Sequence, residues 1–281
     1  SVNGGSLDGY RVQGGNITVS GTGFDARGAD FSEIIARAVK VNAGIWAQQL
    51  KVTAGANEVN AAHTSATPIA GTGAVPKVAI DVALLGGMYA GKIFLVGTEA
   101  GVGVHSAGSM AASAGELIIT ANGRLENTGS LTSTGATQID ASAGIQNSGT
   151  IHAQGNTTLN TAGTIDNAAT AKISGTTTRI TAYTLNNRGL IDGLATVIEI
   201  PSVNNLGTGK IYGDRVAINT TTLRNEAEAG AAPVIAARER LDIGAQTITN
   251  REHAVLFSAG DLALGGSLDA NQHATGRVDT L

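Results

Sequence analysis

Carboxylate side chains are the residues of this sequence that come nearest to a catalytic arrangement. Asp192 and Asp214 lie at similar points of successive sequence repeats, and Glu116 and Asp140 form a second widely spaced pair. Two carboxylates held several ångströms apart hydrolyse glycosidic bonds, one as an acid and the other as a base or nucleophile. A polysaccharide-degrading enzyme is therefore one candidate function, and exposed, solvated carboxylates are the simpler interpretation of both pairs.

The histidines do not form a metal site in the sequence. The chain has five of them, His63, His105, His152, His253 and His273, and no two lie at the spacing of metal ligands. Cysteine is absent, which excludes disulfides, thiolate nucleophiles and cysteine-bound metals. We therefore predict no catalytic residue, no cofactor and no metal site, and a chain that is not an enzyme.

The composition is that of a narrow, closely stacked β structure. Charged residues make up 14% of the 281 residues, aromatic residues 3% and hydrophobic residues 42%, and there are 39 glycines. The net charge of −4 and the scattered basic residues argue against nucleic acid as a partner, because phosphate binding requires clustered Lys and Arg. The longest apolar stretch, residues 78–97, contains Asp81 and Lys92, so we expect no membrane span.

A short motif, an apolar residue followed by a polar residue and an asparagine, repeats along most of the chain. It ends seven times in asparagine, with intervals of 20, 20, 20, 18, 20 and 25 residues, at Asn127, Asn147, Asn167, Asn187, Asn205, Asn225 and Asn250. The triplet Val104-His105-Ser106 precedes the first motif by 21 residues, with serine in place of asparagine. Between the motifs, apolar residues alternate as in strands and are followed by turn residues. A fixed period of this length indicates a repeat architecture.

Three short strands in each 20-residue repeat predict an all-β fold, a parallel β-helix whose coils stack at the spacing of strands. In such a stack each asparagine amide would bond to the amides in the coils above and below it. The middle residue of the motif would face solvent, as in the column of Glu126, Gln146 and Asp166. The same spacing predicts that Asp140, Asn160 and Ile180 share a second column, and neither column holds two consecutive acids. The long interval before Asn250 predicts a loop over residues 226–233.

The first hundred residues are less regular. Residues 41–55 alternate as β-helix coils do, whereas residues 60–77 hold two prolines among Gly, Ser and Thr and predict an excursion from the rod. The stretch DFSEIIARAVKV, residues 30–41, allows an amphipathic helix as an alternative to strands, with Phe31, Ile34, Ile35, Ala38 and Val39 on one face.

Two long stretches of this region resemble a known family. GADFSEIIARAVKVNAGIWAQQLKVTAGANEV, residues 28–59, and LGGMYAGKIFLVGTEAGVGVHSAG, residues 85–108, are similar to the filamentous haemagglutinin type of two-partner-secretion exoprotein, which includes the contact-dependent growth inhibition proteins. The 20-residue units resemble the haemagglutinin repeats. The resemblance implies a right-handed parallel β-helix, with residues 1–104 as the distal part of the secretion domain and residues 105–281 as a haemagglutinin-repeat shaft. We expect the family's signal peptide, N-terminal cap and C-terminal toxin region to lie outside this segment.

The resemblance implies a function as well as a fold. It implies export through an outer-membrane β-barrel transporter, a position at the bacterial cell surface, and a role in virulence as a shaft that displays adhesive or toxin-delivering regions. The receptor on the target cell would then be bound elsewhere in the full chain. The alternatives are the polysaccharide-active enzyme and a segment that itself binds a receptor, through the loops near Thr67 or Ala229.

Overall fold

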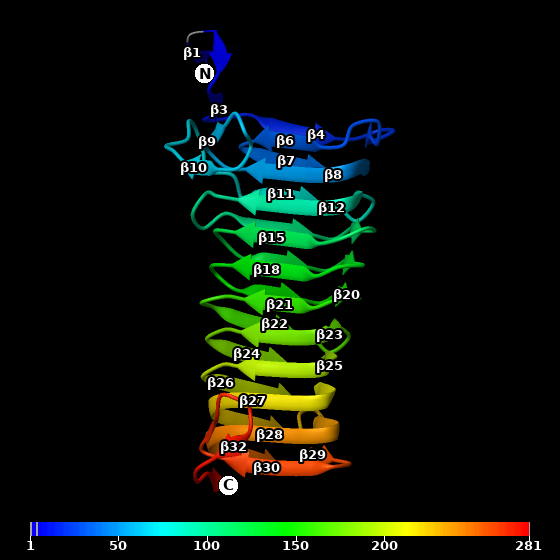
Figure 1. The fold of residues 1–281 in the computed structure, drawn as a ribbon, viewed down its shortest axis with the longest axis vertical. Helices are drawn as coiled ribbons and strands as arrows, with labels where there is room; N and C mark the ends of the chain where they lie inside the picture. The colour runs from blue at the N-terminus through cyan, green and yellow to red at the C-terminus, as the bar shows by residue number, and fades with distance from the viewer. Residues whose placement is uncertain (1, 4, 281) are drawn as a thin grey trace.

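The computed structural model describes residues 2–3 and 5–280, and every regular element in these residues is a β-strand. The chain winds as a parallel solenoid of about 12 turns, with roughly 21 residues in each turn. The two chain ends lie at opposite ends of the resulting column (Figure 1). The predicted parallel β-helix is therefore confirmed. The outer limits of the two predicted regions, residues 1 and 281, lie outside the described residues.

Each turn of the solenoid places strands on three faces, and each strand pairs in parallel with its equivalent in the next turn. The first face holds β4 (Asn16–Val19), β7 (Ala38–Val41), β11 (Val78–Val82), β13 (Gly103–Ser106), β16 (Leu125–Asn127), β19 (Ile145–Asn147), β22 (Thr164–Asn167), β24 (Thr184–Asn187), β26 (Ser202–Leu206) and β33 (Asp279–Thr280). The second face holds β5 (Phe24–Ala26), β14 (Ser109–Ala112), β17 (Ser130–Ser133), β20 (Thr150–Ala153) and β29 (Val255–Ser258). The third face holds β6 (Ser32–Ala36), β15 (Leu117–Ala121), β18 (Thr137–Ala141), β21 (Thr157–Asn160) and β30 (Asp261–Gly265).

Several longer strands continue around a corner of the solenoid. Those that cover the second and third faces are β8 (Gly44–Ala54), β12 (Gly87–Gly97), β23 (Lys172–Thr181) and β25 (Leu190–Glu199). Two more continue onto the first face of the following turn, β27 (Lys210–Glu226) and β28 (Val234–Arg251). The turn at residues 227–233 joins these two strands and contains Ala229 at a φ of 52°. The loop predicted in the longest repeat interval is therefore present.

The core consists of columns of aliphatic side chains, one residue from each turn. On the first face, Leu125, Ile145, Ile165 and Leu185 lie in register and are buried. Equivalent columns line the other two faces. Because each strand alternates between the interior and solvent, a repeat of about 20 residues places an aliphatic residue at each level of every column.

Residues 30–41 form strands, so the helix alternative for this stretch is wrong. Ile34 and Ala36 of β6 point inward and are buried, whereas Ile35 between them is half-buried. In β7, Val39 and Val41 are buried on either side of exposed Lys40. This period of two is that of a strand, and pairing with β8 and β11 fixes it.

Three small groups of strands lie outside the solenoid. β1 (Val2–Asn3) pairs with β2 (Ser6–Leu7), and β31 (Ser267–Leu268) with β32 (Ala274–Thr275), both antiparallel. β3 (Gly9–Val12) joins β9 (Asn57–Asn60) and β10 (Ala66–Pro68) in an antiparallel sheet beside the column, near its N-terminal end (Figure 1). The chain then returns to the solenoid at β11.

A buried ion pair fastens this excursion to the column. Nη2 of Arg37 lies 2.7 Å from Oε1 of Glu99, and the two side chains are 5% and 16% exposed. Arg37 also donates from Nη1 to the carbonyl oxygen of Thr72, 2.6 Å away. The hydrogen bonds from Arg37 hold the pKa of Glu99 below its ordinary value.

Candidate functional site

Asparagine side chains form a continuous hydrogen-bonded ladder on the first face. In every step, Nδ2 of one asparagine donates to Oδ1 of the asparagine in the next turn, at distances of 2.7 to 2.9 Å. The ladder contains all seven asparagines of the repeated motif, Asn127, Asn147, Asn167, Asn187, Asn205, Asn225 and Asn250. This confirms the amide column predicted from the spacing.

The second amide hydrogen of each ladder residue closes the adjacent corner. Asn147 donates to the carbonyl oxygen of Lys172, 3.3 Å away, which begins the second-face strand one turn later. Asn167 does the same to Leu190 at 3.4 Å, and Asn187 to Lys210 at 3.3 Å. A buried amide offers two donor hydrogens, and both are satisfied at these positions. The ladder therefore joins each turn to the next and also fixes the corner between the first and second faces.

Glycine follows at the same corner because the coils approach too closely for a side chain. A Cβ atom on Gly149 would lie 2.0 Å from the carbonyl oxygen of Gly129, and a Cβ on Gly129 would lie 2.0 Å from that of Gly108. Both contacts are with backbone, which cannot move aside without disturbing the next coil. At the corners that contain Gly129 and Gly149, the backbone of the neighbouring coil therefore leaves no room for a side chain.

A second polar column, of threonine, was not predicted. Thr137, Thr157, Thr178 and Thr196 occupy one inward position of the third face and are buried. The hydroxyl of Thr157 donates to the carbonyl oxygen of Ser174 at 2.8 Å, and that of Thr178 to the carbonyl of Asp192 at 2.7 Å. The spacing of these threonines, 18 to 21 residues, was the signal in the sequence that would have found them.

One predicted outward column is confirmed and the other is wrong in one member. Glu126, Gln146 and Asp166 lie in register as predicted. Asp140 lies level with Asn160, but the next residue of that column is Thr181, and Ile180 points inward in register with Leu159. The corner after Asn167 has two residues more than the corner one turn earlier, and the next corner has one residue fewer, so the third face of that turn is shifted by one residue.

Neither predicted carboxylate pair is brought together. Ile191 pairs with Ile211, so Asp192 lies level with Tyr212, and Asp214 lies two residues further along the strand. The carboxylate of Asp214 accepts a hydrogen bond from Nε of Arg238.

The second predicted pair is separated by the register as well. Asp140 pairs with Thr120, whereas Glu116 immediately precedes Leu117, which pairs with Thr137. Asp140 thus lies four residues further along the strand than the level of Glu116, a distance of about 13 Å, so these two acids do not share a site.

The histidines lie in separate surroundings. Nδ1 of His105 lies 2.7 Å from Oδ1 of Asp81, and Nδ1 of His152 lies 2.9 Å from the hydroxyl of Ser174. His63 contacts the buried carboxylate of Glu33. Within the described part of the chain, no group of three or more potential ligands is placed to hold a metal ion.

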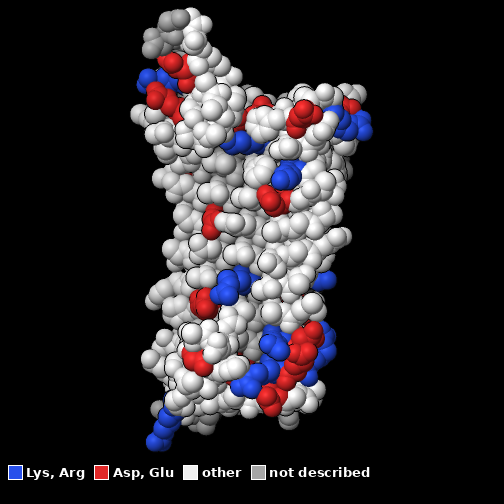
Figure 2. Space-filling view, viewed as in Figure 1, with Lys and Arg blue, Asp and Glu red and all other residues white. Residues whose placement is uncertain are grey.

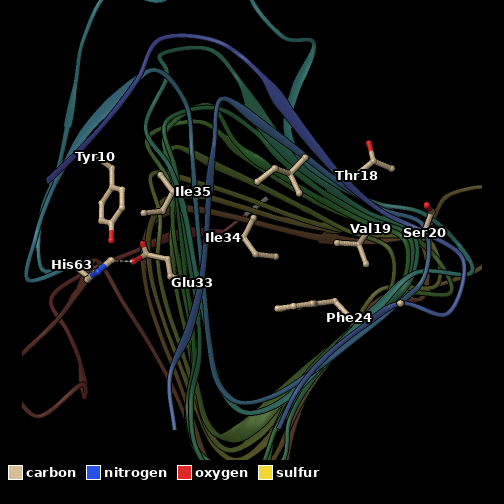
Figure 3. A pocket seen from close by; sticks show the side chains of 11 residues that line it. Tyr10, Thr18, Val19, Ser20, Phe24, Glu33, Ile34, Ile35 and His63 are labelled. Carbon is tan, nitrogen blue, oxygen red and sulfur yellow. Dashed lines mark hydrogen bonds and ion pairs between the residues drawn. The ribbon is translucent and has the colours of Figure 1, made fainter. Parts of the chain in front are cut away.

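A pocket opens at the N-terminal end of the solenoid. Val19, Phe24 and Ile34 point into the space that the coil encloses, whereas His63 and Glu33 lie on its outer side (Figure 3). Val19 and Ile34 are in register with Val41 and Val52 of the next turn, which fill the tube there. The pocket is therefore the end of the apolar core columns, without the polar groups of a catalytic cleft in its interior.

On the face shown in Figure 2, charged side chains are sparse along the middle of the column and gather toward its two ends. Near the C-terminal end, Glu226 accepts hydrogen bonds from Arg224 and Arg251, each at 2.5 Å, while its side chain is only 8% exposed. Burial raises the pKa of Glu226, but the bonds from the two arginines outweigh burial and lower it overall. Arg188 binds Glu228 in the turn at residues 227–233 through two nitrogen atoms. These ions pair with one another, so they hold the coils together rather than forming a surface of one sign.

Comparisons with known proteins agree with this geometry. Residues 1–127 match the family model of the TPS secretion domain, and residues 132–221 match that of the haemagglutinin repeat. No solved structure matches the chain. In the residues that the structure describes, no helix has the length and hydropathy needed to cross a membrane.

Similar curated proteins are much longer than this chain. A protein of Yersinia pestis named toxin CdiA is 56% identical over 133 residues, which is 47% of this chain and 4% of the relative. The tRNA nuclease CdiA-2 of Burkholderia pseudomallei is 50% identical over 125 residues, and a tRNA nuclease CdiA of Escherichia coli is 45% identical over 133 residues. These two matches cover 44% and 47% of this chain, and each covers 4% of the relative. With a match to the secretion domain followed by a match to the haemagglutinin repeat on one continuous β-helix, the chain is similar to the filamentous haemagglutinin-type two-partner-secretion exoproteins, and it is a secreted protein exposed at the bacterial cell surface.

Proposed function

We propose that this chain is a structural segment of a long exoprotein, a rod that carries adhesive or toxin-delivering regions located elsewhere in the same protein. The observation that supports the proposal most is the unbroken asparagine ladder from Asn127 to Asn250, which ties turn to turn along the shaft. Each turn contacts only its neighbours, as in other solenoids, so the rod extends by repetition. The toxin and nuclease activities named for the relatives belong to proteins of which this chain matches 4%.

The partner in export would be an outer-membrane β-barrel transporter of the two-partner system. The match of residues 1–127 to a secretion domain supports this proposal. The absence of cysteine suits a chain that crosses the periplasm unfolded, because no disulfide can lock it there. The division into a secretion-type region, residues 1–104, and a repeat shaft, residues 105–281, stays a prediction.

Coil-on-coil templating would let the chain fold as it emerges from the cell. The contacts that define each new turn are made with the turn before it, so no other factor is needed. Purified chain, unfolded in denaturant and diluted, should recover the circular dichroism of β-sheet by itself. Failure to do so without added factors would exclude self-templated folding.

A deletion experiment tests the role of a shaft. Removing residues 128–147 from the full-length protein takes out one whole turn and joins Asn127 to Ser148, which preserves the ladder pattern. The shortened protein should still reach the cell surface and keep the activity of its distal regions. The matched control removes residues 128–137, half a turn, which breaks the register and should abolish surface display. Loss of the distal activity, with surface display intact, in the whole-turn deletion would contradict a passive shaft.

The two alternative functions have direct tests as well. Turnover of acidic glycans by the 281-residue chain, lost in Asp192→Ala or Asp214→Ala, would identify an enzyme. Binding of the isolated chain to host or bacterial cells, lost on changing Thr67 or Ala229, would identify a receptor-binding segment. We expect neither, because the acids lie out of register and Ala229 lies in a turn whose Glu228 is bound to Arg188.

A further inference from the structure

The asparagine ladder ends at Asn127, one turn after Ser106. Ser106 and Asn127 are register partners in the same inward column, and both are fully buried at 0% exposure. Among the described residues, Oγ of Ser106 and Oδ1 of Asn127 are two of three buried side-chain polar atoms without a hydrogen-bond partner. Both of these atoms belong to a single interface between two consecutive turns.

The column changes its chemistry at this interface. Before Ser106 it contains Val19, Val41 and Val82, which pack as aliphatic side chains in register. From Asn127 onward it contains only asparagines. Stacked valines bury no side-chain polar atom, and stacked asparagines hydrogen-bond to one another. A serine between a valine and an asparagine instead leaves buried polar atoms without hydrogen-bond partners.

The direction of the hydrogen bonds in the ladder explains why the unpaired acceptor lies at the N-terminal end of the ladder. Every asparagine donates toward the C-terminal side, so each Oδ1 must accept from the turn before it. At the other end, Nδ2 of Asn250 donates to the carbonyl oxygen of Ala254, 3.0 Å away, and is satisfied. Only the acceptor of Asn127 depends on a donor that the preceding turn does not supply.

We infer that the rod has a built-in weak interface between the turn of residues 103–121 and the turn that begins at Leu125, and that it divides there into two cooperative folding units. In a solenoid, stability is a sum of terms for single turns and for neighbouring interfaces, so cooperativity breaks at the weakest interface. The match to the secretion domain ends at residue 127 and the match to the repeats begins at residue 132, close to this interface. The two units can therefore unfold separately.

Hydrogen exchange of the 281-residue chain, followed by mass spectrometry at increasing denaturant, tests this division. Peptides that end before residue 122 and peptides that begin after residue 125 should open in two separate transitions, each group with its own dependence on denaturant, because a weak interface does not couple the two units. A single common opening of all peptides would overturn the inference.

Two substitutions should move the boundary in opposite directions. Ser106→Asn supplies a donor to Asn127 and leaves its own Oδ1 against Val82, so the boundary should move one turn toward the N-terminus. Asn127→Val continues the aliphatic column and leaves Oδ1 of Asn147 without a donor, so the boundary should move one turn toward the C-terminus. The control, His105→Gln, changes the outward neighbour of Ser106 and should leave the boundary in place. A boundary that stays at residues 122–125 in both variants would overturn the inference; if Ser106→Asn does not fold, Asn127→Val decides alone.

Discussion

Nδ2 of Asn147 lies 2.9 Å from Oδ1 of Asn167, although 20 residues separate them in the chain. The pair is buried, and each residue bonds in the same way to a further asparagine on its other side. One contact therefore fixes two quantities at once, the number of residues in a turn and the register of that turn on the next.

Removal of one ladder side chain should destabilise the shaft. Asn167→Ala leaves the amide of Asn147 without an acceptor and Oδ1 of Asn187 without a donor, both in a buried column. We expect a loss of about 3 kcal/mol in the free energy of unfolding, measured by denaturant titration. Glu126→Ala, on the solvent-facing side of the same face, should change it by less than about 0.5 kcal/mol. Equal effects of the two substitutions would show that the ladder does not stabilise the fold.

The tight corner makes a second prediction, for glycine. Gly149→Ala places a Cβ 2.0 Å from the backbone oxygen of Gly129, so the coil must shift, at a cost of about 2 kcal/mol. Gly28→Ala is the control, because a Cβ there has open space around it. The difference between their thermal unfolding midpoints measures the effect. A Gly149→Ala chain as stable as the control would mean that the corner is looser than described.

Much of this fold was predictable because the register is local. The asparagine spacing predicted the ladder and the column of Glu126, Gln146 and Asp166, since each turn repeats the last with few changes. The prediction that placed Ile180 in the column of Asp140 was wrong because it assumed a constant repeat. The corner that follows Asn167 is longer than the corner one turn earlier. The alternation of apolar residues in the sequence does not show at which corner the additional residues lie.

The contacts of the excursion lay beyond what the sequence pattern reveals. Arg37 and Glu99 are 62 residues apart, and their pairing depends on where the chain returns to the solenoid. The helix alternative for residues 30–41 was also wrong because it ignored contacts with distant residues. The apolar residues of that stretch fit both the period of a helix and the period of a strand, and pairing with neighbouring strands selects the strand.

The buried pair of the excursion makes a third prediction. Arg37→Met leaves the carboxylate of Glu99 without its cation and should destabilise the region by about 3 kcal/mol. Limited proteolysis should then cleave within residues 57–77 well before the shaft. Arg11→Met is the control, because Arg11 and Glu58 form an ion pair that is more than half exposed. If the segment in Arg37→Met resists protease as well as the control does, the pair does not fasten the excursion.

Acid should weaken the ion pairs that Glu99 and Glu226 form with arginines. The folded chain holds the pKa values of Glu99 and Glu226 below their ordinary value of 4.5, so both ionised groups stabilise the fold above that pH. That contribution is lost as pH falls below 4.5 and through the lowered pKa values. The unfolding midpoint should therefore drop between about pH 5 and pH 2, and Glu99→Gln should show a smaller drop than the unchanged chain. An equally steep drop in Glu99→Gln would assign the acid sensitivity to other groups.

Distances between spin labels test the stacking of turns most directly. The chain has no cysteine, so pairs of cysteines can be introduced at the outward column, with one label at Glu126 and the other at Asn204, Arg224 or Thr249. These residues lie four, five and six turns away, so the distances should be about 19, 24 and 29 Å, an increase of about 4.8 Å with each turn. Distances that do not increase in this regular way with the number of turns would contradict the β-helix.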